Sequence, residues 1–411
     1  MPLDMNFVES QFPALRGRPF TYLDNAGGSL VLQGVADRVR DYLLTSSVQH
    51  GATYAKSQLA MERVAAAQRS VATLINAGRP EEVVMGPSTT ALLRILGIAI
   101  GETLSPGDEV IVSLSEHESN FGPWEKLQKK GVKLVPWAVE PGSFRLDPQR
   151  LASLMTSRTK LVCCTHASNI LGTINPVREF ADIAHAHGAK ICVDAVAYAP
   201  HRLVDVRALD VDYYVFSFYK VYGPHHAVLY GRYDDLVALP GQNHFFVEPK
   251  RTAYKFQPGN VNYELAYGCI GINEYLVELA RRGGAPAGDE RAALTSAFDL
   301  ISEQEEQICR VLIDYLNTIE GVRIIGEMTA DAAIRVPTVS FVTQKGRHSD
   351  IVKAIDSFNI GIRYGDFYAR RLAEHLHLDP EQGVIRVSMV HYNTADEINR
   401  LIQKLHPLLS G

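Results

Sequence analysis

The stretch Val211-Asp212-Tyr213-Tyr214-Val215-Phe216-Ser217-Phe218-Tyr219-Lys220-Val221-Tyr222-Gly223-Pro224 places a lysine at the end of an apolar run. The run of β-branched and aromatic residues predicts a buried strand, and the Gly-Pro pair ends it. Loss of hydration lowers the pKa of such a lysine and makes it a candidate nucleophile toward carbonyl compounds. A lone strand-end lysine more often reaches back to water, so Lys220 needs support from elsewhere in the chain.

Strands and helices alternate from residue 81 to about residue 232, and this pattern predicts the fold class. The predicted strands are 82–86, 109–115, 133–139, 160–165, 190–194, 213–216 and 227–230. Helical periodicity fills most of the segments between them, which predicts a mainly parallel α/β sheet with helices on both faces. In such sheets the ligand binds beyond the carboxyl ends of the strands.

The alternation fades after residue 232, and a glycine-rich segment at 282–288 has the composition of a linker. A long helix is predicted at about 294–318, followed by a looser pattern of shorter strands and helices, among them a strand at 360–364. We therefore expect a large domain over 21–285 and a smaller α+β domain formed by 1–20 and 286–411.

Polar side chains directly follow several of the predicted strands. Asp194 closes the apolar segment 190–194, and a buried carboxylate there needs a partner such as a protonated heterocyclic nitrogen. Ser88-Thr89-Thr90 opens a helix, where the hydroxyl groups either bind an anion or simply cap the helix. His117 and Asn169 follow two further strands. The His117 ring could stack on a ligand or transfer a proton, and the Asn169 amide could donate and accept hydrogen bonds. Both could instead be structural residues.

These side chains together fit one cofactor, pyridoxal phosphate. It has an aldehyde for a lysine, a pyridine nitrogen for a carboxylate, a phosphate for a helix start and a flat ring. Arg386 adds a further candidate, because an arginine on the apolar strand 384–390 suits an amino-acid carboxylate, although an internal salt bridge explains it equally well.

The segment 216–224 resembles the cofactor-lysine segment of fold-type I pyridoxal phosphate enzymes of the class V aminotransferase group. The closest branch looks like the cysteine desulfurases and selenocysteine lyases. Further matching segments follow in family order over nearly the whole chain: 22–26, 89–90, 116–120, 123–124, 168–173, 193–194, 386–388 and 392–394. The resemblance implies a large domain with a mainly parallel seven-stranded sheet and a smaller α+β C-terminal domain.

The resemblance also implies residue roles. Lys220 would carry the cofactor and move protons, Asp194 would pair with the pyridine nitrogen, and His117 would stack on the ring. The other residues implied to bind the cofactor are Thr89, Thr90 and Ser217 at the phosphate, and Asn169, Tyr219 and Asn260. The resemblance places Arg386 and Asn169 at the substrate carboxylate. We also expect Ala26 and Gly27 at the substrate, and His50 and Arg363 as contacts for a side-chain carboxylate, although Arg363 could equally form a structural pair. Asn260 matches the place from which the family's partner subunit reaches the phosphate, which implies a homodimer.

Three residues depart from the desulfurase pattern. Tyr368, in the segment 363–369, stands where those enzymes carry a catalytic cysteine, and a phenol cannot form a persulfide. Tyr219 replaces the histidine before the lysine, and Ala197 replaces a glutamine that binds the ring oxygen. With the segment 390–394, these departures resemble a fungal branch that decarboxylates aspartate at the β position and adds the resulting carbanion to an aldehyde.

We therefore expect a pyridoxal phosphate-dependent lyase that acts on an L-α-amino acid, with cleavage of a C–C or C–S bond at or beyond Cβ. Aspartate β-decarboxylation with aldol addition is one form of this reaction. The alternatives are a class V aminotransferase or amino-acid epimerase, which uses the same residues, and a non-catalytic cofactor-binding partner protein.

The composition sets further limits. The chain has 411 residues, 46% of them hydrophobic and 21% charged, with a net charge of −5, which gives no sign of nucleic-acid or membrane binding. No run of apolar residues is long enough to span a membrane, and the N-terminus shows no secretory signal. The five cysteines form no Cys-x-x-Cys pair, so we expect free thiols, no metal site and a cytoplasmic protein.

Overall fold

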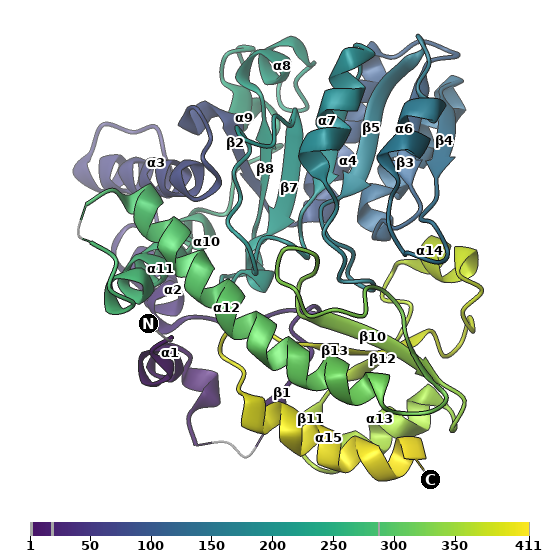
Figure 1. Cartoon of the computed structure of the whole chain (residues 1–411). Helices are drawn as coiled ribbons and strands as arrows, with labels where there is room; N and C mark the ends of the chain where they lie inside the picture. Colours follow the sequence, from purple (N-terminus) through teal and green to yellow (C-terminus); the bar gives the residue numbers. More distant parts are fainter. Residues whose placement is uncertain (1–2, 18–19, 287, 411) are drawn as a thin grey trace.

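A seven-stranded sheet forms the centre of the larger body, at the top of Figure 1. The computed structural model describes residues 3–17, 20–286 and 288–410. The strands are β2 (Val83–Gly86), β3 (Glu109–Ser113), β4 (Lys133–Trp137), β5 (Thr159–Thr165), β6 (Lys190–Asp194), β7 (Tyr213–Ser217) and β8 (Ala227–Gly231), in the order β2-β8-β7-β6-β5-β3-β4. Only β8 runs antiparallel to its neighbours, because the connection from β7 is too short for a crossover. The predicted α/β sheet is confirmed.

Both faces of this sheet are buried except along the edge strand β4, where Lys133 and Pro136 are exposed. Val110 and Val112 of β3 pack into one core, whereas Ile111 between them packs into the other. This explains why the strands are apolar throughout instead of alternating. The helices of this body are α2 (Gln33–Thr45), α3 (Ala55–Ile75), α4 (Thr89–Thr103), α5 (Gly122–Glu125), α6 (Pro148–Leu154), α7 (Val177–Ala186), α8 (Tyr233–Ala238), α9 (Thr252–Lys255), α10 (Tyr263–Gly268) and α11 (Ile270–Arg282).

The smaller body contains a four-stranded antiparallel sheet in the order β12-β13-β10-β9. Its strands are β9 (Val322–Ile324), β10 (Thr338–Thr343), β12 (Arg363–Gly365) and β13 (Val384–Ser388), and its helices are α13 (His348–Asp356), α14 (Arg370–His375) and α15 (Ala395–Ser410). The long helix α12 (Glu290–Asn317) runs along both bodies in Figure 1. Its first half packs into the core of the larger body, and its second half packs into that of the smaller one.

The N-terminal segments connect the two bodies. Helix α1 (Met5–Gln11) packs on α11, where the rings of Phe7 and Tyr275 stack with centroids 5.8 Å apart. Strand β1 (Thr21–Tyr22) opens the range 21–285, yet it pairs with β11 (Ile360–Gly361). The single strand predicted over 360–364 is therefore wrong, because its first residues pair with β1 and its last ones, in β12, pair with β13.

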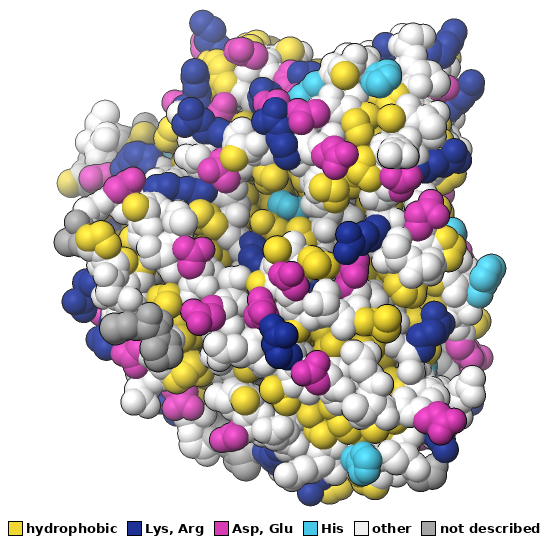
Figure 2. Space-filling view, viewed as in Figure 1, with side chains coloured by type: hydrophobic (Ala, Val, Ile, Leu, Met, Phe, Trp, Pro, Cys, Tyr) yellow, Lys and Arg dark blue, Asp and Glu magenta, His cyan; other side chains and the backbone are white. Residues whose placement is uncertain are grey.

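On the face drawn in Figure 2, basic and acidic side chains are interspersed, and neither charge predominates. Among the described residues, no helix combines the length and apolar character that a membrane span requires.

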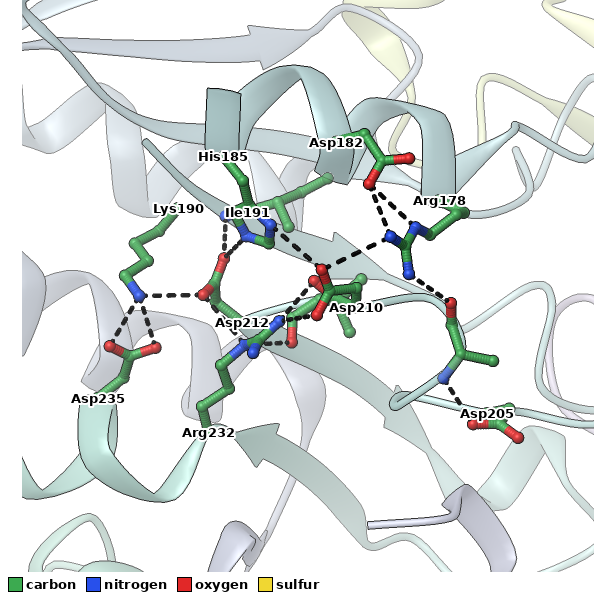
Figure 3. A network of polar contacts seen from close by, with 12 residues as sticks. Arg178, Asp182, His185, Lys190, Ile191, Asp205, Asp210, Asp212, Arg232 and Asp235 are labelled. Atoms are coloured by element: carbon green, nitrogen blue, oxygen red, sulfur yellow. Dashed lines mark hydrogen bonds and ion pairs between the residues drawn. The ribbon is translucent and has the colours of Figure 1, made fainter. Parts of the chain in front are cut away.

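A polar network fixes the sheet at the edge where β6 and β7 begin (Figure 3). At its centre is the carboxylate of Asp212, which is 1% exposed. It accepts hydrogen bonds from the Ile191 backbone nitrogen at 2.8 Å and the Lys190 Nζ at 3.1 Å, and it contacts the His185 Nε2 at 2.8 Å and the Arg232 Nε at 3.3 Å. The network lies at the opposite edge from the carboxyl ends of these strands, so we expect it to stabilise the fold without taking part in ligand binding.

Replacing Asp212 by alanine should lower the free energy of unfolding by about 1.5–3 kcal/mol, because it removes hydrogen bonds to charged groups. Denaturant unfolding measures this change. Asp182 is a matched control, since it belongs to the same network but its side chain is 55% exposed. Its replacement by alanine should cost less than about 1 kcal/mol. Equal losses in the two variants would contradict this account of the network.

Candidate active site

A cavity with about 530 Å³ of empty space lies beyond the carboxyl ends of β5, β6 and β7. All of the residues predicted to bind the cofactor except Asn260 line it: Thr89, Thr90, His117, Asn169, Asp194, Ser217, Tyr219 and Lys220. They come from different segments because the carboxyl ends of neighbouring parallel strands meet at one edge of the sheet.

Lys220 and Asp194 are both buried in this cavity. Lys220 ends the short 3-10 helix η5 (Phe218–Lys220), and burial, with a smaller effect of Arg386, lowers the pKa of its amine to about 8. Burial raises the pKa of the Asp194 carboxyl to about 6, although its Oδ1 accepts a hydrogen bond from the Val196 nitrogen at 2.9 Å. An amine with a lowered pKa is a better nucleophile near neutral pH.

His117 presents a neutral ring to the cavity. Burial, with smaller effects of the positive charges of Lys220 and Arg386, lowers the pKa of its imidazole to about 4. The Ser119 backbone nitrogen donates to the His117 Nδ1 at 3.1 Å, and the Ser119 hydroxyl contacts the same atom. A neutral, fixed ring of this kind suits stacking against an aromatic ligand.

Hydroxyl groups gather at the start of α4. The Oγ1 of Thr89, the first residue of the helix, lies 2.7 Å from the Oγ of Ser217, which ends β7. The Thr90 side chain lines the same part of the cavity. Free backbone N–H groups and the helix dipole favour an anion at such a helix start.

Arg386 lies in β13, next to the cavity residue Asn169, and is 1% exposed. Its Nη1 donates to the Asn169 carbonyl oxygen at 3.2 Å, and its Nη2 pairs with the Asp24 Oδ1 at 3.0 Å. Its guanidinium also lies 3.6 Å from the ring centroid of Phe367. The Nε is buried and has no hydrogen-bond partner among the described residues. The internal salt bridge that the sequence left open as an alternative is therefore present, and one buried donor is still available to an acceptor.

Arg363 lies directly opposite Arg386 in the sheet register of β12 and β13. Its Nη1 is 3.6 Å from the Oδ2 of Asp24, and its side chain is 55% exposed. Asp24 therefore bridges two guanidinium groups, of which only that of Arg363 is open to solvent.

These groups fit pyridoxal phosphate. The cavity offers an amine with a lowered pKa at Lys220, a buried carboxyl at Asp194, a flat neutral ring at His117 and hydroxyl groups at a helix start, represented by Thr89. These are the partners that the aldehyde, the ring nitrogen, the ring face and the phosphate require.

Six of the predicted residues do not line this cavity: Arg386 and Arg363, described above, and Asn260, His50, Ala26 and Gly27. Asn260 is exposed in the loop before α10, and the His50 ring stacks on that of Tyr263 with centroids 3.6 Å apart. The Ala26 nitrogen donates to the Ser388 Oγ at 2.8 Å, and Gly27 lines a neighbouring groove. Tyr219 does line the cavity, and its ring stacks on that of His225 with centroids 5.1 Å apart.

The sequence reasoning assigned no role to Asp24 or Ser119, although Asp24 pairs with two arginines and Ser119 fixes the His117 ring. Asp24 had a signal that could have been used, because it follows an apolar strand and precedes two glycines, as a site residue often does. Ser119 had no comparable signal.

The segment that contains Phe367 and Tyr368, where the sequence resemblance places the desulfurase cysteine, forms a tight turn. Phe367 and Tyr368 have φ of 51° and 61°, in the left-handed region. The Asn169 Nδ2 donates to the Phe367 carbonyl oxygen at 3.0 Å, and the Glu118 nitrogen donates to that of Tyr368 at 2.8 Å. The Tyr368 side chain is 72% exposed, with its ring centroid 5.4 Å from that of His117. The turn thus places a phenol beside the cavity.

Comparisons with known proteins identify the family. The model of the family "Aminotransferase class-V" matches residues 21–283 and 290–401. The chain is 39% identical over 410 residues to the aminotransferase-like protein FGM3 of Gibberella zeae, covering 98% of both chains. It is 32% identical over 419 residues to the cysteine desulfurase-like protein ustD of Aspergillus flavus, covering 99% of this chain and 91% of the other.

The fold agrees with this match. The crystal structure of the cysteine desulfurase CsdA from Escherichia coli superposes with a TM-score of 0.84 at 26% identity, covering 100% of this chain and 99% of that one. This confirms the fold-type I architecture expected from the sequence, and the cofactor of these enzymes is pyridoxal phosphate. The chain therefore belongs to the aminotransferase class-V family of pyridoxal phosphate-dependent enzymes.

Proposed function

We propose that this protein is a pyridoxal phosphate-dependent lyase that acts on an L-α-amino acid, and that it is not a cysteine desulfurase that forms a persulfide. It would cleave a C–C or C–S bond at or beyond Cβ. The specific form that we propose is β-decarboxylation of aspartate, followed by addition of Cβ to an aldehyde.

The observation that carries this proposal is the distribution of thiols. All five cysteines of the chain are buried, and none lines the cavity. Burial raises the pKa of the thiols of Cys163, Cys164, Cys269 and Cys309, which disfavours the nucleophilic thiolate. The turn beside the cavity carries the phenol of Tyr368 instead, which cannot accept sulfur.

The chain's own residues would act as follows. When bound, pyridoxal phosphate supplies an electron sink for charge that develops on the substrate. Arg386 would bind the α-carboxylate through its free donor, and Asp194 would keep the ring nitrogen protonated. The Lys220 amine, which lies close enough to Asp194 and Arg386 for both charges to affect its pKa, would take up and return the proton at Cα.

Arg363 supports a substrate with a second carboxylate. Its guanidinium is half exposed beside Arg386, and its 3.6 Å contact with Asp24 is longer than the 3.0 Å contact of Arg386. It could therefore bind a side-chain carboxylate at a small cost. In the proposed reaction the Cβ–Cγ bond of aspartate breaks, carbon dioxide leaves, and the electron pair on Cβ takes a proton or attacks the aldehyde carbon.

Incubation of the purified holoenzyme with single amino acids should give alanine and carbon dioxide from aspartate, and a γ-hydroxy amino acid when an aldehyde is added. Mass spectrometry detects these products. Arg363→Gln should raise KM for aspartate about tenfold, because the substrate would lose one charge-assisted hydrogen bond. Alanine from cysteine at a comparable rate, with the sulfur retained as a persulfide and released as sulfide by an added thiol reductant, would contradict the proposal. Pyridoxamine phosphate or a D-amino acid would favour transamination or epimerisation.

We also propose a homodimer in which Asn260 of one copy reaches the phosphate end of the other copy's cavity. Members of this family typically act as dimers. The exposure of Asn260 and its position outside the cavity of its own chain support a contact with a second copy.

A further inference from the structure

The backbone just after the cofactor lysine is strained. Tyr222, two residues after Lys220, has a φ of 59° and is fully buried. Bulky residues rarely adopt the left-handed region, and they do so only where the surroundings impose it. Both the backbone and the side chain of Tyr222 are held in place, and the Tyr222 carbonyl oxygen accepts a hydrogen bond from the Leu32 nitrogen at 3.1 Å.

The Tyr222 hydroxyl takes part in two hydrogen bonds. It donates to the Pro200 carbonyl oxygen at 2.7 Å, and it lies 3.1 Å from the Nδ1 of His391. A hydroxyl has a single proton, and a carbonyl oxygen can only accept, so the His391 Nδ1 must donate to Tyr222. The Nε2 of the same ring then accepts from the Tyr275 hydroxyl, at 2.6 Å. Burial lowers the pKa of His391 to about 3, which agrees with this neutral tautomer.

The bond between His391 and Tyr222 connects the two halves of the site. His391 follows β13, the strand that carries Arg386, whereas Tyr222 belongs to the turn that carries Lys220. The turn is also held from the N-terminal segment, because the Tyr222 nitrogen donates to the Ser29 Oγ at 2.9 Å. His391 therefore provides a direct side-chain bond from the Arg386 segment to the Lys220 turn.

We propose that His391 is a positioning residue, whose hydrogen bond to Tyr222 fixes the Lys220 turn relative to the Arg386 segment. This inference rests on the proposed roles of Lys220 and Arg386. A substrate held by Arg386 must present its Cα to Lys220, and small errors in such a geometry are costly in rate. Loss of the bond should let the turn relax from its strained conformation and loosen the cofactor lysine.

A double-mutant cycle with His391→Phe and Tyr222→Phe tests the proposal. Both variants keep a ring in place and remove the bond from opposite ends. In each variant, we expect hydroxylamine to remove the cofactor about tenfold faster. We also expect 2-aminoisobutyrate, an amino acid without an α-hydrogen, to bind about tenfold more weakly. Cofactor absorbance measures both effects. Each single variant also loses a second bond, from Tyr222 to Pro200 or from Tyr275 to His391. Because both remove the shared bond, the double variant should be clearly less impaired than the sum of the two single effects.

Two further variants separate positioning from general loss of structure. His391→Gln keeps a donor and an acceptor and should recover most of the wild-type hydroxylamine rate. Tyr275→Phe leaves the bond from His391 to Tyr222 intact and should change both measurements less than twofold. Additive effects in the cycle, or a Tyr275→Phe variant as impaired as His391→Phe, would overturn the proposal. If no amino acid changed the cofactor absorbance of the wild-type protein, the proposed function would be contradicted. The hydroxylamine rates would still test the role of His391.

Discussion

Lys220→Ala is expected to abolish the absorbance band that the cofactor gives when joined to the protein, and to lower kcat by at least about 10³-fold. The buried amine with its lowered pKa is the group that would bond to the cofactor aldehyde and move the substrate proton, and alanine can do neither. Absorbance spectra of purified protein with added pyridoxal phosphate measure the first effect, and product formation measures the second.

Lys255→Met is the matched control for this variant. Lys255 is also buried and its pKa is also lowered by burial, but its Nζ donates to the carbonyl oxygens of Val237 and Leu239 and does not line the cavity. We expect this variant to keep the absorbance band. A band that survives in Lys220→Ala, or disappears in Lys255→Met, would mean that another lysine carries the cofactor.

Asp194→Asn should leave the cofactor bound through Lys220 but lower kcat by about 10²–10³-fold, the size expected when one preorganised electrostatic contact is lost. An amide cannot keep the pyridine nitrogen protonated, so the ring becomes a poorer electron sink. The absorbance band should remain while single-turnover kinetics slow.

Glu116→Gln provides the comparison. Glu116 is the other carboxyl buried near Asp194, and burial raises its pKa to about 8, so it is mostly uncharged at neutral pH. It accepts a hydrogen bond from the Asn120 Nδ2 at 2.7 Å. Because glutamine resembles the protonated acid, this variant should keep kcat within a few-fold. If both variants lost activity equally, the charge of Asp194 could not be the cause.

The site could be predicted where it depends on local sequence. Asp194, Ser217 and Lys220 each follow an apolar strand, and the ends of parallel strands converge by geometry alone. The strands of the larger sheet were located within about two residues, because both of its faces are buried and the apolar runs are continuous.

The contacts between distant segments could not be predicted in this way. Asp24 and Arg386 are 362 residues apart in the sequence, and no local pattern shows that they pair. Tyr222 has a left-handed backbone, and its hydroxyl lies 3.1 Å from the Nδ1 of His391, 169 residues further along the chain, whereas sequence reasoning expects glycine at such positions. The strand at 360–364 was divided because β1, far away in the chain, pairs with only its first residues.

The most direct measurement is a crystal structure of the protein purified with pyridoxal phosphate. It should show one cofactor ring between two residues, with C4′ bonded to the Lys220 Nζ and the pyridine nitrogen within about 3 Å of an Asp194 carboxylate oxygen. A cofactor bonded to another lysine, or a ring nitrogen that faces a group other than Asp194, would contradict the account.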